Sequence, residues 1–529
     1  MKKVLISALQ ILCATLIFLI FLEGAFYLLG FPQGGSAYLE GIVTREKLSA
    51  QKPKDEFRIF TYGESTMHGA HYVPASSPSR WLKVYLEDFL PRRNIRVINF
   101  GRMGKGSDFH YEIFRDSVAY KPDVVIFYLG HNAFLPGNWK DQVEAKHAQA
   151  KGILRDRLRH SRLFSGFYRW VIKIRRNYKS GLPEEEIIEY REIETRPAKI
   201  HRPDVILHDD PRYWQNIQFQ KENIIKILDL AEKKGIHCLF FKPAGNLKDF
   251  APTYSIHLKK LSPQELSKWK GLYQQGKKAE KRKDFSRALK FYNRAYKIDP
   301  TYAHLCFRMG KLYFAKGDLQ TAKHLFQEAR DYDAVIVRAT SDTLSMFEEL
   351  KDARNLQFID TKKILEPESP GGILGEPIIE DNVHFSLKGH ALIGRAMAEE
   401  IAQRDWIVPR EEWQFHRERP YEEILKELGV SKELLFSAFL KMVSYFGSRY
   451  DNRIRFAQRA LEIYPDDPRA LRHLAWSYWL KGEKEKALGV YQRLADVNPE
   501  ALKLVIETLP EIREAYTNFV AGKQNQLAA

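Results

Sequence analysis

Three short runs rich in β-branched and aromatic residues alternate with helix-period segments early in the chain. The runs FRIFTYG, IRVINFG and DVVIFYLG each end in glycine, and SRWLKVYLEDFL and SDFHYEIFRDSVAY lie between them. Strands that alternate with amphipathic helices form parallel sheets, because each helix returns the chain to the starting edge. The pattern resumes at 223–243 and 356–360, and a helix with Ser386 as its N-cap closes the unit. The sequence therefore predicts a three-layer α/β domain with a parallel sheet.

A second region repeats itself at a spacing of 34 residues. The first copy carries small, aromatic and proline residues at Gly276, Ala279, Ala288, Tyr292, Ala295 and Pro300, and the second has Gly310, Tyr313, Ala322, Phe326, Ala329 and Ala334. Small residues at these positions let two antiparallel helices pack closely, which is the tetratricopeptide (TPR) pattern. Tyr478, Ala487, Tyr491 and Pro499 fit the same template, and Ala460 with Pro465 gives a weaker copy. Such repeats bind peptides or proteins or act as spacers, and both roles remain open.

The charge of the chain is strongly positive but evenly spread. There are 84 Lys and Arg against 67 Asp and Glu, a formal net charge of +17. Because the basic residues are mixed with acids along the whole chain, we interpret them as a solvated surface and expect no nucleic-acid partner. Only three cysteines occur, with no CxxC pair, which excludes a disulfide framework.

The amino-terminal residues have the composition of a membrane anchor. Lys2 and Lys3 precede a run at 4–22 that is apolar apart from three polar residues, and 31–44 contains no Lys or Arg. About 19 residues at 1.5 Å each span the hydrocarbon of a bilayer. The positive-inside rule places the amino terminus in the cytoplasm. We therefore predict a single-pass inner (cell) membrane protein whose bulk is extracytoplasmic, in the periplasm.

The stretch TYGESTMHG places a serine directly after a strand-like run. Ser65 needs a general base and an orienting group to act as a nucleophile. The segment EDNVHFSLKGH puts Asp381 three residues before His384, so the carboxylate can reach one imidazole nitrogen while the other faces outward. A polar loop closed by a helix cap and a metal-binding pair are alternatives. We expect no metal and no cofactor, because no further Asp, Glu or His cluster adjoins the pair.

Donors for a developing oxyanion follow two other strands. The segment NFGRMGKGS supplies backbone amides of glycine, and YLGHNAF supplies the side-chain amide of Asn132. Turn formation would also explain these residues. However, polar groups after successive parallel strands lie at the sheet edge where such folds bind ligands. The order of these segments favours a catalytic site.

These four segments resemble the blocks of the SGNH/GDSL esterase-lipase superfamily. The blocks correspond to Gly63-Glu64-Ser65, to 99–107, to Gly130-His131-Asn132 and to 381–384. The resemblance implies a flavodoxin-like fold, with Ser65 as nucleophile, His384 as base and Asp381 as the orienting carboxylate. It also implies an oxyanion hole made by the Ser65 amide, the Gly104 amide and the Asn132 side chain.

The resemblance covers residues 57–132 and about 220–402, and two residues depart from it. Glu64 replaces the usual Asp, and Ala133 replaces the Asp that often follows the asparagine. Neither position belongs to the triad. The segment KPAGNLKDFAP resembles a membrane-anchored, TPR-containing subgroup, and its Asn246 is our candidate substrate-binding residue.

The expected organisation has seven parts. They are an anchor at 1–30, the hydrolase domain at 55–137, 206–260 and 336–405, a helical insertion at 138–205, a TPR insertion at 261–335 and TPR-like helices at 420–529.

Taken together, the residues and the resemblance predict a membrane-anchored serine esterase. Its expected substrate is an acetyl ester on an envelope glycan or lipid, and the TPR faces are candidate surfaces for a protein partner. Two alternatives remain: an O-acyltransferase acting on an envelope polysaccharide, and a catalytically silent TPR scaffold for envelope assembly.

Overall fold

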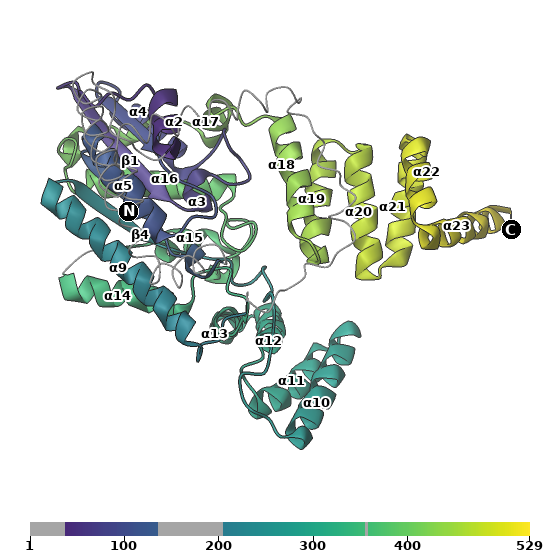
Figure 1. The fold of residues 1–529 in the computed structure, drawn as a ribbon. Coiled ribbons are helices and arrows are strands. Elements are labelled where there is room, and N and C mark those ends of the chain that lie inside the picture. Colours follow the sequence, from purple (N-terminus) through teal and green to yellow (C-terminus); the bar gives the residue numbers. More distant parts are fainter. Residues whose placement is uncertain (1–36, 136–204, 355–357, 529) are drawn as a thin grey trace, which may run out of the picture. The chain divides into compact units, whose positions relative to one another are not determined.

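The computed structural model describes residues 37–135, 205–354 and 358–528 in two compact units (Figure 1). Within these ranges the first unit holds 37–70, 77–135, 205–354 and 358–418, and the second holds 71–76 and 419–528. None of the helices in the described ranges combines the length and apolar character needed to cross a bilayer. The predicted anchor at 1–30 and nearly all of the predicted insertion at 138–205 lie outside the described residues.

The first unit is built on a five-stranded parallel sheet. Its strands are β1 (Glu56–Gly63), β2 (Asn94–Asn99), β3 (Val124–Tyr128), β4 (His237–Lys242) and β5 (Phe358–Asp360), in the order β2-β1-β3-β4-β5. Thr61 of β1 is paired with Asn99 of β2 on one side and with Ile126 of β3 on the other. The predicted parallel α/β sheet is confirmed. The strand order reverses between β1 and β3, where doubly wound sheets open a crevice at their carboxyl ends.

Helices cover both faces of the sheet. They are α2 (Ala37–Arg45), α3 (Ser65–His68), α4 (Pro78–Phe89), α5 (Ser107–Ser117), α9 (Pro211–Lys234), α14 (Ser341–Arg354), α15 (Thr361–Leu365) and α16 (Leu387–Ala402). Short 3-10 turns are η1 (Val118–Tyr120), η2 (Asn132–Phe134), η4 (Glu366–Glu368), η5 (Pro370–Gly372), η6 (Arg410–Glu412) and η7 (Phe415–Arg417). Thr61 bonds Ser79 of α4 on one face. On the other face, the core includes buried side chains of α5, α9 and α14.

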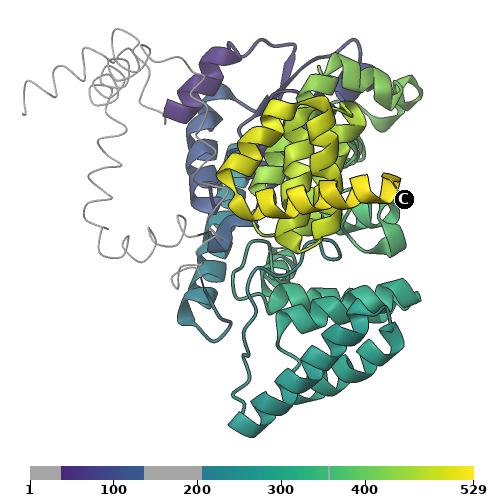
Figure 2. The same cartoon turned by 90° about the vertical axis from the view of Figure 1, so that its right-hand side faces the viewer.

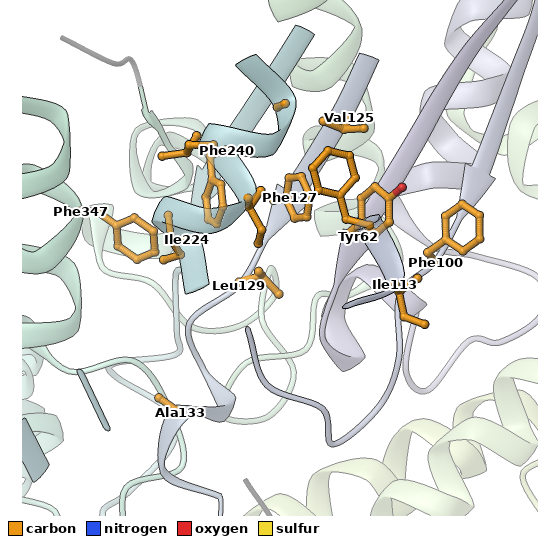
Figure 3. Packing of buried hydrophobic residues seen from close by; sticks show 14 of the residues in the cluster. Tyr62, Phe100, Ile113, Val125, Phe127, Leu129, Ala133, Ile224, Phe240 and Phe347 are labelled. Atoms are coloured by element: carbon orange, nitrogen blue, oxygen red, sulfur yellow. The ribbon is translucent and has the colours of Figure 1, made fainter. Parts of the chain in front are cut away.

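A row of stacked aromatic rings forms the centre of that core (Figure 3). The ring centroids of Tyr62 and Phe127 are 4.7 Å apart, and those of Phe127 and Phe240 are 5.5 Å apart. These residues come from the adjacent strands β1, β3 and β4, so each ring lies beside the next across the sheet. The strand ends that carry the candidate site are therefore fixed by a closely packed apolar core.

Four of the helices between β4 and β5 form the TPR pair (Figure 2). They are α10 (Pro263–Lys281), α11 (Phe285–Ile298), α12 (Ala303–Lys316) and α13 (Leu319–Asp331). A Cβ at Gly276 would lie 2.3 Å from the Tyr292 ring, and one at Gly310 would lie 2.8 Å from the Phe326 ring. Glycine is therefore needed where α10 meets α11 and where α12 meets α13, as the spacing of 34 residues predicts.

The insertion is joined tightly to the sheet domain. Phe326 and Ala322 of α13 pack against Leu247, which follows β4, and against Ile373. Asp333 lies where the insertion rejoins the sheet domain. Its carboxylate accepts hydrogen bonds from the backbone N–H groups of Thr253 and Tyr254 before the insertion and of Val335 after it, at 2.6–3.2 Å. The insertion therefore shares a core with the segments that flank it.

The second unit consists of helices. They are α17 (Tyr421–Glu427), α18 (Lys432–Tyr445), α19 (Tyr450–Ile463), α20 (Pro468–Lys481), α21 (Lys484–Val497), α22 (Pro499–Thr508) and α23 (Pro510–Ala528). Ala460, Ala487 and Tyr491, which the repeat pattern singles out, are fully buried. The helical pairing predicted for the carboxyl-terminal part is thus present, with two further helices after the last repeat.

Candidate active site

Ser65, His384 and Asp381 lie in one hydrogen-bonded line. The Ser65 Oγ is 2.6 Å from His384 Nε2, and His384 Nδ1 is 2.5 Å from an Asp381 carboxylate oxygen. All three side chains are buried, and Asp381 is completely enclosed. Its second oxygen accepts the backbone N–H groups of Val383 and His384 at 2.9 and 2.8 Å. The carboxylate is therefore held in one orientation. A buried hydroxyl, imidazole and carboxylate in this order can activate the hydroxyl, because the imidazole can take its proton while the carboxylate orients the ring.

Close contacts at the end of β1 position Ser65. A Cβ at Gly63 would lie 2.6 Å from Met67 Cβ and 2.6 Å from the Tyr128 carbonyl oxygen, so only glycine fits before the turn. Ser65 then opens the short helix α3. The hydroxyl of Thr66 donates to the Val383 carbonyl at 3.2 Å, which ties this turn to the histidine segment.

A small turn presents Asp381 and His384. Residues Ile379 and Phe385 form an antiparallel bridge around it, and the Glu380 N–H donates to the His384 carbonyl at 3.0 Å. Directly after the turn, the Ser386 hydroxyl accepts the Gly389 N–H and caps α16, as the sequence predicts. The spacing of three residues therefore places both side chains of the pair on the same side of a closed turn.

The segment that carries Gly104 and the segment that carries Asn132 contact each other. The Asn132 side-chain amide donates to the Lys105 carbonyl at 3.0 Å, and Lys105 follows Gly104 directly. Gly104 has a φ of +69°, in the left-handed region that favours glycine. The structure thus brings together the segments that carry Gly104 and Asn132.

Glu64 organises the loop that carries Asn132, a role that the sequence did not indicate. Its buried carboxylate accepts three backbone N–H groups, those of Gly130 at 3.1 Å, His131 at 2.9 Å and Asn132 at 3.1 Å. Burial raises the pKa of Glu64 to about 7, although the three hydrogen bonds favour the charged form. The only signal in the sequence was the departure of Glu64 from the usual Asp.

His131 connects the same loop to the segment after the TPR insertion. Its Nδ1 accepts the Ala339 N–H at 3.2 Å, so the proton must be on Nε2, which lies 3.2 Å from the Tyr128 hydroxyl. Burial lowers the pKa of His131 to about 3 and keeps the ring neutral. The neutral ring bridges three segments and holds the loop in place.

Asn246 is placed differently from the other candidates. Its side chain is fully buried; its amide donates to the Ile379 carbonyl at 3.1 Å and its oxygen accepts the Asp249 N–H at 2.9 Å. These bonds brace the segment that leads to Asp381. The geometry therefore gives Asn246 a bracing role, and its expected contact with substrate stays a prediction.

Comparisons with known proteins identify the repeats. Two family models, both described as tetratricopeptide repeat, match residues 279–335 and 454–501. The chain therefore contains TPR repeats both in the insertion and in the second unit. A comparison with curated protein sequences gave no match.

Solved structures resemble both kinds of fold at low identity. One is YrrB, a TPR protein with an unusual peptide-binding site, at 16% identity over 45% of this chain and 91% of that chain, with a TM-score of 0.14. Another is described as a "putative GDSL-like lipase" from Parabacteroides merdae ATCC 43184, at 12% identity over 66% of this chain and 97% of that chain, with a TM-score of 0.24. At these TM-scores the similarities carry no weight for activity.

Proposed function

We propose that the α/β domain is a membrane-anchored, extracytoplasmic serine esterase of the SGNH type, with a flavodoxin-like fold. The observation that carries the proposal is the continuous line from Ser65 through His384 to Asp381, with heavy-atom distances of 2.6 and 2.5 Å. A catalytically silent scaffold does not require a serine hydroxyl aligned on a histidine that is itself held by a buried carboxylate.

In the proposed reaction the Ser65 hydroxyl attacks the ester carbonyl carbon. His384 Nε2 takes the hydroxyl proton, and the Asp381 carboxylate stabilises the resulting imidazolium through Nδ1–H. The imidazolium then protonates the leaving alcohol, which departs and leaves an acyl group on Ser65. Water, deprotonated by the same histidine, attacks the acyl group and releases the acid. In the acyl-transfer alternative, a sugar hydroxyl replaces this water.

The negative oxygen of the tetrahedral intermediate is assigned to three donors. These are the backbone amides of Ser65 and Gly104 and the side-chain amide of Asn132. The bond between the Asn132 amide and the Lys105 carbonyl supports this assignment, since it joins the side chain of Asn132 to the residue that follows Gly104. Glu64 supplies the positioning by fixing the backbone on which Asn132 stands. No metal or cofactor is required for this reaction.

The proposed substrate is an acetyl ester on an envelope glycan or lipid. We infer this substrate class from the proposed location alone. A phosphatase fused after residue 60 is expected to be active outside the cytoplasm, whereas a fluorescent reporter that matures only in the cytoplasm stays dark there. The reverse result would contradict both the location and the envelope substrate.

Active-site labelling with a fluorophosphonate probe tests the reaction. The purified full chain is expected to be labelled, and Ser65→Ala to lose both labelling and hydrolysis of a small acetyl ester. Ser255→Ala is a matched control, because Ser255 Oγ also bonds a histidine, His304 Nδ1, at 2.5 Å. Labelling that persists in Ser65→Ala, or is lost in Ser255→Ala, would place the nucleophile elsewhere. A wild-type chain that neither reacts nor hydrolyses esters would favour the scaffold alternative.

A further inference from the structure

The loop after β2, which we call the glycine loop (101–106), ends in an exposed tip. Arg102, Met103, Gly104 and Lys105 are all exposed, and Met103 has 53% of its surface accessible. There is no acidic residue in this loop, so the two basic residues give it a formal charge of +2. The proposed reaction uses only a backbone amide of this loop. The exposed methionine and its flanking cations therefore need another explanation.

Aromatic rings support both cations of the loop. The Arg102 guanidinium carbon is 4.8 Å from the centre of the Tyr38 ring, and Lys105 Nζ is 5.6 Å from that of Phe109. The two rings are 5.6 Å apart. Tyrosine rings and basic side chains with apolar stems are groups that proteins place at the level of lipid headgroups.

Acidic residues lie on the neighbouring helices and just after α2. Glu40 of α2 and Asp108 of α5 are half-buried, and each already has an interaction partner. Glu46, just after α2, is half-buried and pairs with Arg45 at 3.0 Å. The exposed residues of the tip itself include two cations and a methionine but no carboxylate.

Helix α2 joins the glycine loop to the amino-terminal apolar segment. The Tyr38 hydroxyl donates to the Gly101 carbonyl, and Leu39 and Ile42 are buried in the same core as α5. Only six residues, 31–36, separate α2 from the predicted anchor, and they span about 20 Å at most. An anchored chain must therefore keep this loop close to the bilayer surface.

We propose that the glycine loop docks on the membrane, with Arg102 and Lys105 on the phosphates of anionic phospholipids and Met103 among the upper acyl carbons. The site would then act on an ester carried by a lipid. This inference rests on the proposed anchor and esterase activity. Because Gly104 belongs to both the docking loop and the oxyanion hole, a lipid-borne ester reaches the nucleophile without leaving the bilayer surface.

Photo-crosslinking tests the contact independently of catalysis. A benzophenone amino acid replaces Met103 in the full chain, reconstituted in nanodiscs of mixed phosphatidylglycerol and phosphatidylcholine. The matched control is position 504, where Leu504 has a similar exposure of 55% in the second unit. We expect lipid adducts at position 103 at least ten-fold above those at 504, enriched in phosphatidylglycerol. Equal adducts at the two positions, or no enrichment, would overturn the proposal.

Kinetics test what the contact does. An umbelliferyl acetate tethered to a phospholipid is compared with free umbelliferyl acetate, and the ratio of the two kcat/KM values is measured. Lys105→Glu changes the charge of the glycine loop by two. The ratio is therefore expected to fall roughly 30-fold, because KM for the tethered ester rises. Lys278→Glu, at an exposed lysine of α10, is expected to leave it unchanged. An unchanged ratio in Lys105→Glu would contradict the proposal.

The remaining outcomes separate this proposal from the esterase itself. Crosslinking at 103 in a chain that never reacts with fluorophosphonate supports the docking loop and contradicts the esterase. Ester hydrolysis without adducts at 103 contradicts the docking loop alone. If millimolar inorganic phosphate abolishes the preference for phosphatidylglycerol, the loop is a site for soluble anions, and the lipid proposal is wrong.

Discussion

The two TPR regions of this chain have the same packing but different neighbours. In the insertion, Phe326 is buried against Leu247 and Ile373, which flank the segments that lead to the candidate site. In the second unit, Phe456 is just as buried, but its aromatic contacts are Phe439 and Phe446 of the same unit. The difference indicates that membership of the TPR family does not by itself determine what a repeat does in this chain. What distinguishes the two regions is whether the repeat shares its core with segments that lead to the candidate site.

The largest expected effect tests this difference directly. Phe326→Ala and Phe456→Ala should each lower the free energy of unfolding by about 3–5 kcal/mol, because each leaves a cavity in a closed core. Only Phe326→Ala is expected to lower kcat on a small soluble ester as well. Urea unfolding and steady-state kinetics measure the two quantities. A kcat loss in Phe456→Ala would show that the second unit is coupled to the site too.

Two buried asparagines extend the comparison to polar groups. In the proposed reaction, Asn132→Ala removes a donor that bonds the tetrahedral intermediate more strongly than the ground-state ester. It should therefore lower kcat by about 10²- to 10³-fold, equivalent to about 3–4 kcal/mol, and leave KM within a few-fold. Asn452→Ala, at a buried asparagine of the second unit, should change stability and leave kcat unchanged. A large KM rise in Asn132→Ala would instead make it a substrate-binding residue.

The two units should also respond to acid with opposite signs. Burial lowers the pKa of His473 from 6.5 to about 4, so the unfolded chain binds a proton first and the second unit loses stability as pH falls from 6.5 toward 4. The difference corresponds to roughly 3 kcal/mol. Glu64, whose pKa is raised from 4.5 to about 7, contributes stability that is lost as pH rises through that range.

Hydrogen exchange measured helix by helix separates these contributions. In the wild type, the amides of α20 should lose protection as the pH falls from 6.5 to 4.5. In His473→Gln this loss should be much smaller, as shown by comparing the two proteins at each pH. Protection in β1 and β3 serves as the internal control, because His473 lies in the other unit. An identical pH response in the variant and the wild type would exclude His473 as the source.

The sequence predicts the features that depend on local spacing. Strand runs ending in glycine give the parallel sheet, the 34-residue offset gives the paired helices, and Asp381 with His384 gives a pair that the structure closes onto Ser65. Each of these follows from periodicity or from residues a few positions apart. The topological order of the strands then brings their ends together.

Features that depend on distant partners could not be derived in this way. The three donors to Glu64 lie 66–68 residues further along the chain, so the carboxylate has no local sign of its role. Asn246 stands in a polar segment that favours a surface loop, yet its bonds run to Ile379 and its side chain is enclosed. The shared core of the insertion likewise depends on Leu247 meeting Phe326.

The smallest expected effect concerns the two glutamates that best contrast the units. Glu64 is buried against three backbone donors, whereas Glu433 is exposed and accepts a hydrogen bond from the Tyr464 hydroxyl at 2.8 Å. In Glu64→Gln the amide keeps one acceptor oxygen, but its NH₂ group faces an N–H donor. At least one of the three N–H groups then loses its acceptor, at a cost of about 1–2 kcal/mol. Since these N–H groups fix the backbone of Asn132, kcat should fall about ten-fold with KM unchanged.

Glu64→Asp keeps the charge but shortens the side chain by one methylene, so it should recover part of the lost kcat. Glu433→Gln should change neither kcat nor stability by more than about 0.5 kcal/mol, because exposed carboxylates contribute little. Steady-state kinetics on the small ester, with unfolding measured in parallel, distinguishes positioning from simple stability. If Glu64→Gln changed stability but kept full kcat, the carboxylate would only support the fold. If Glu64→Asp were as poor as Glu64→Gln, the geometry of the bonds would matter more than their charge.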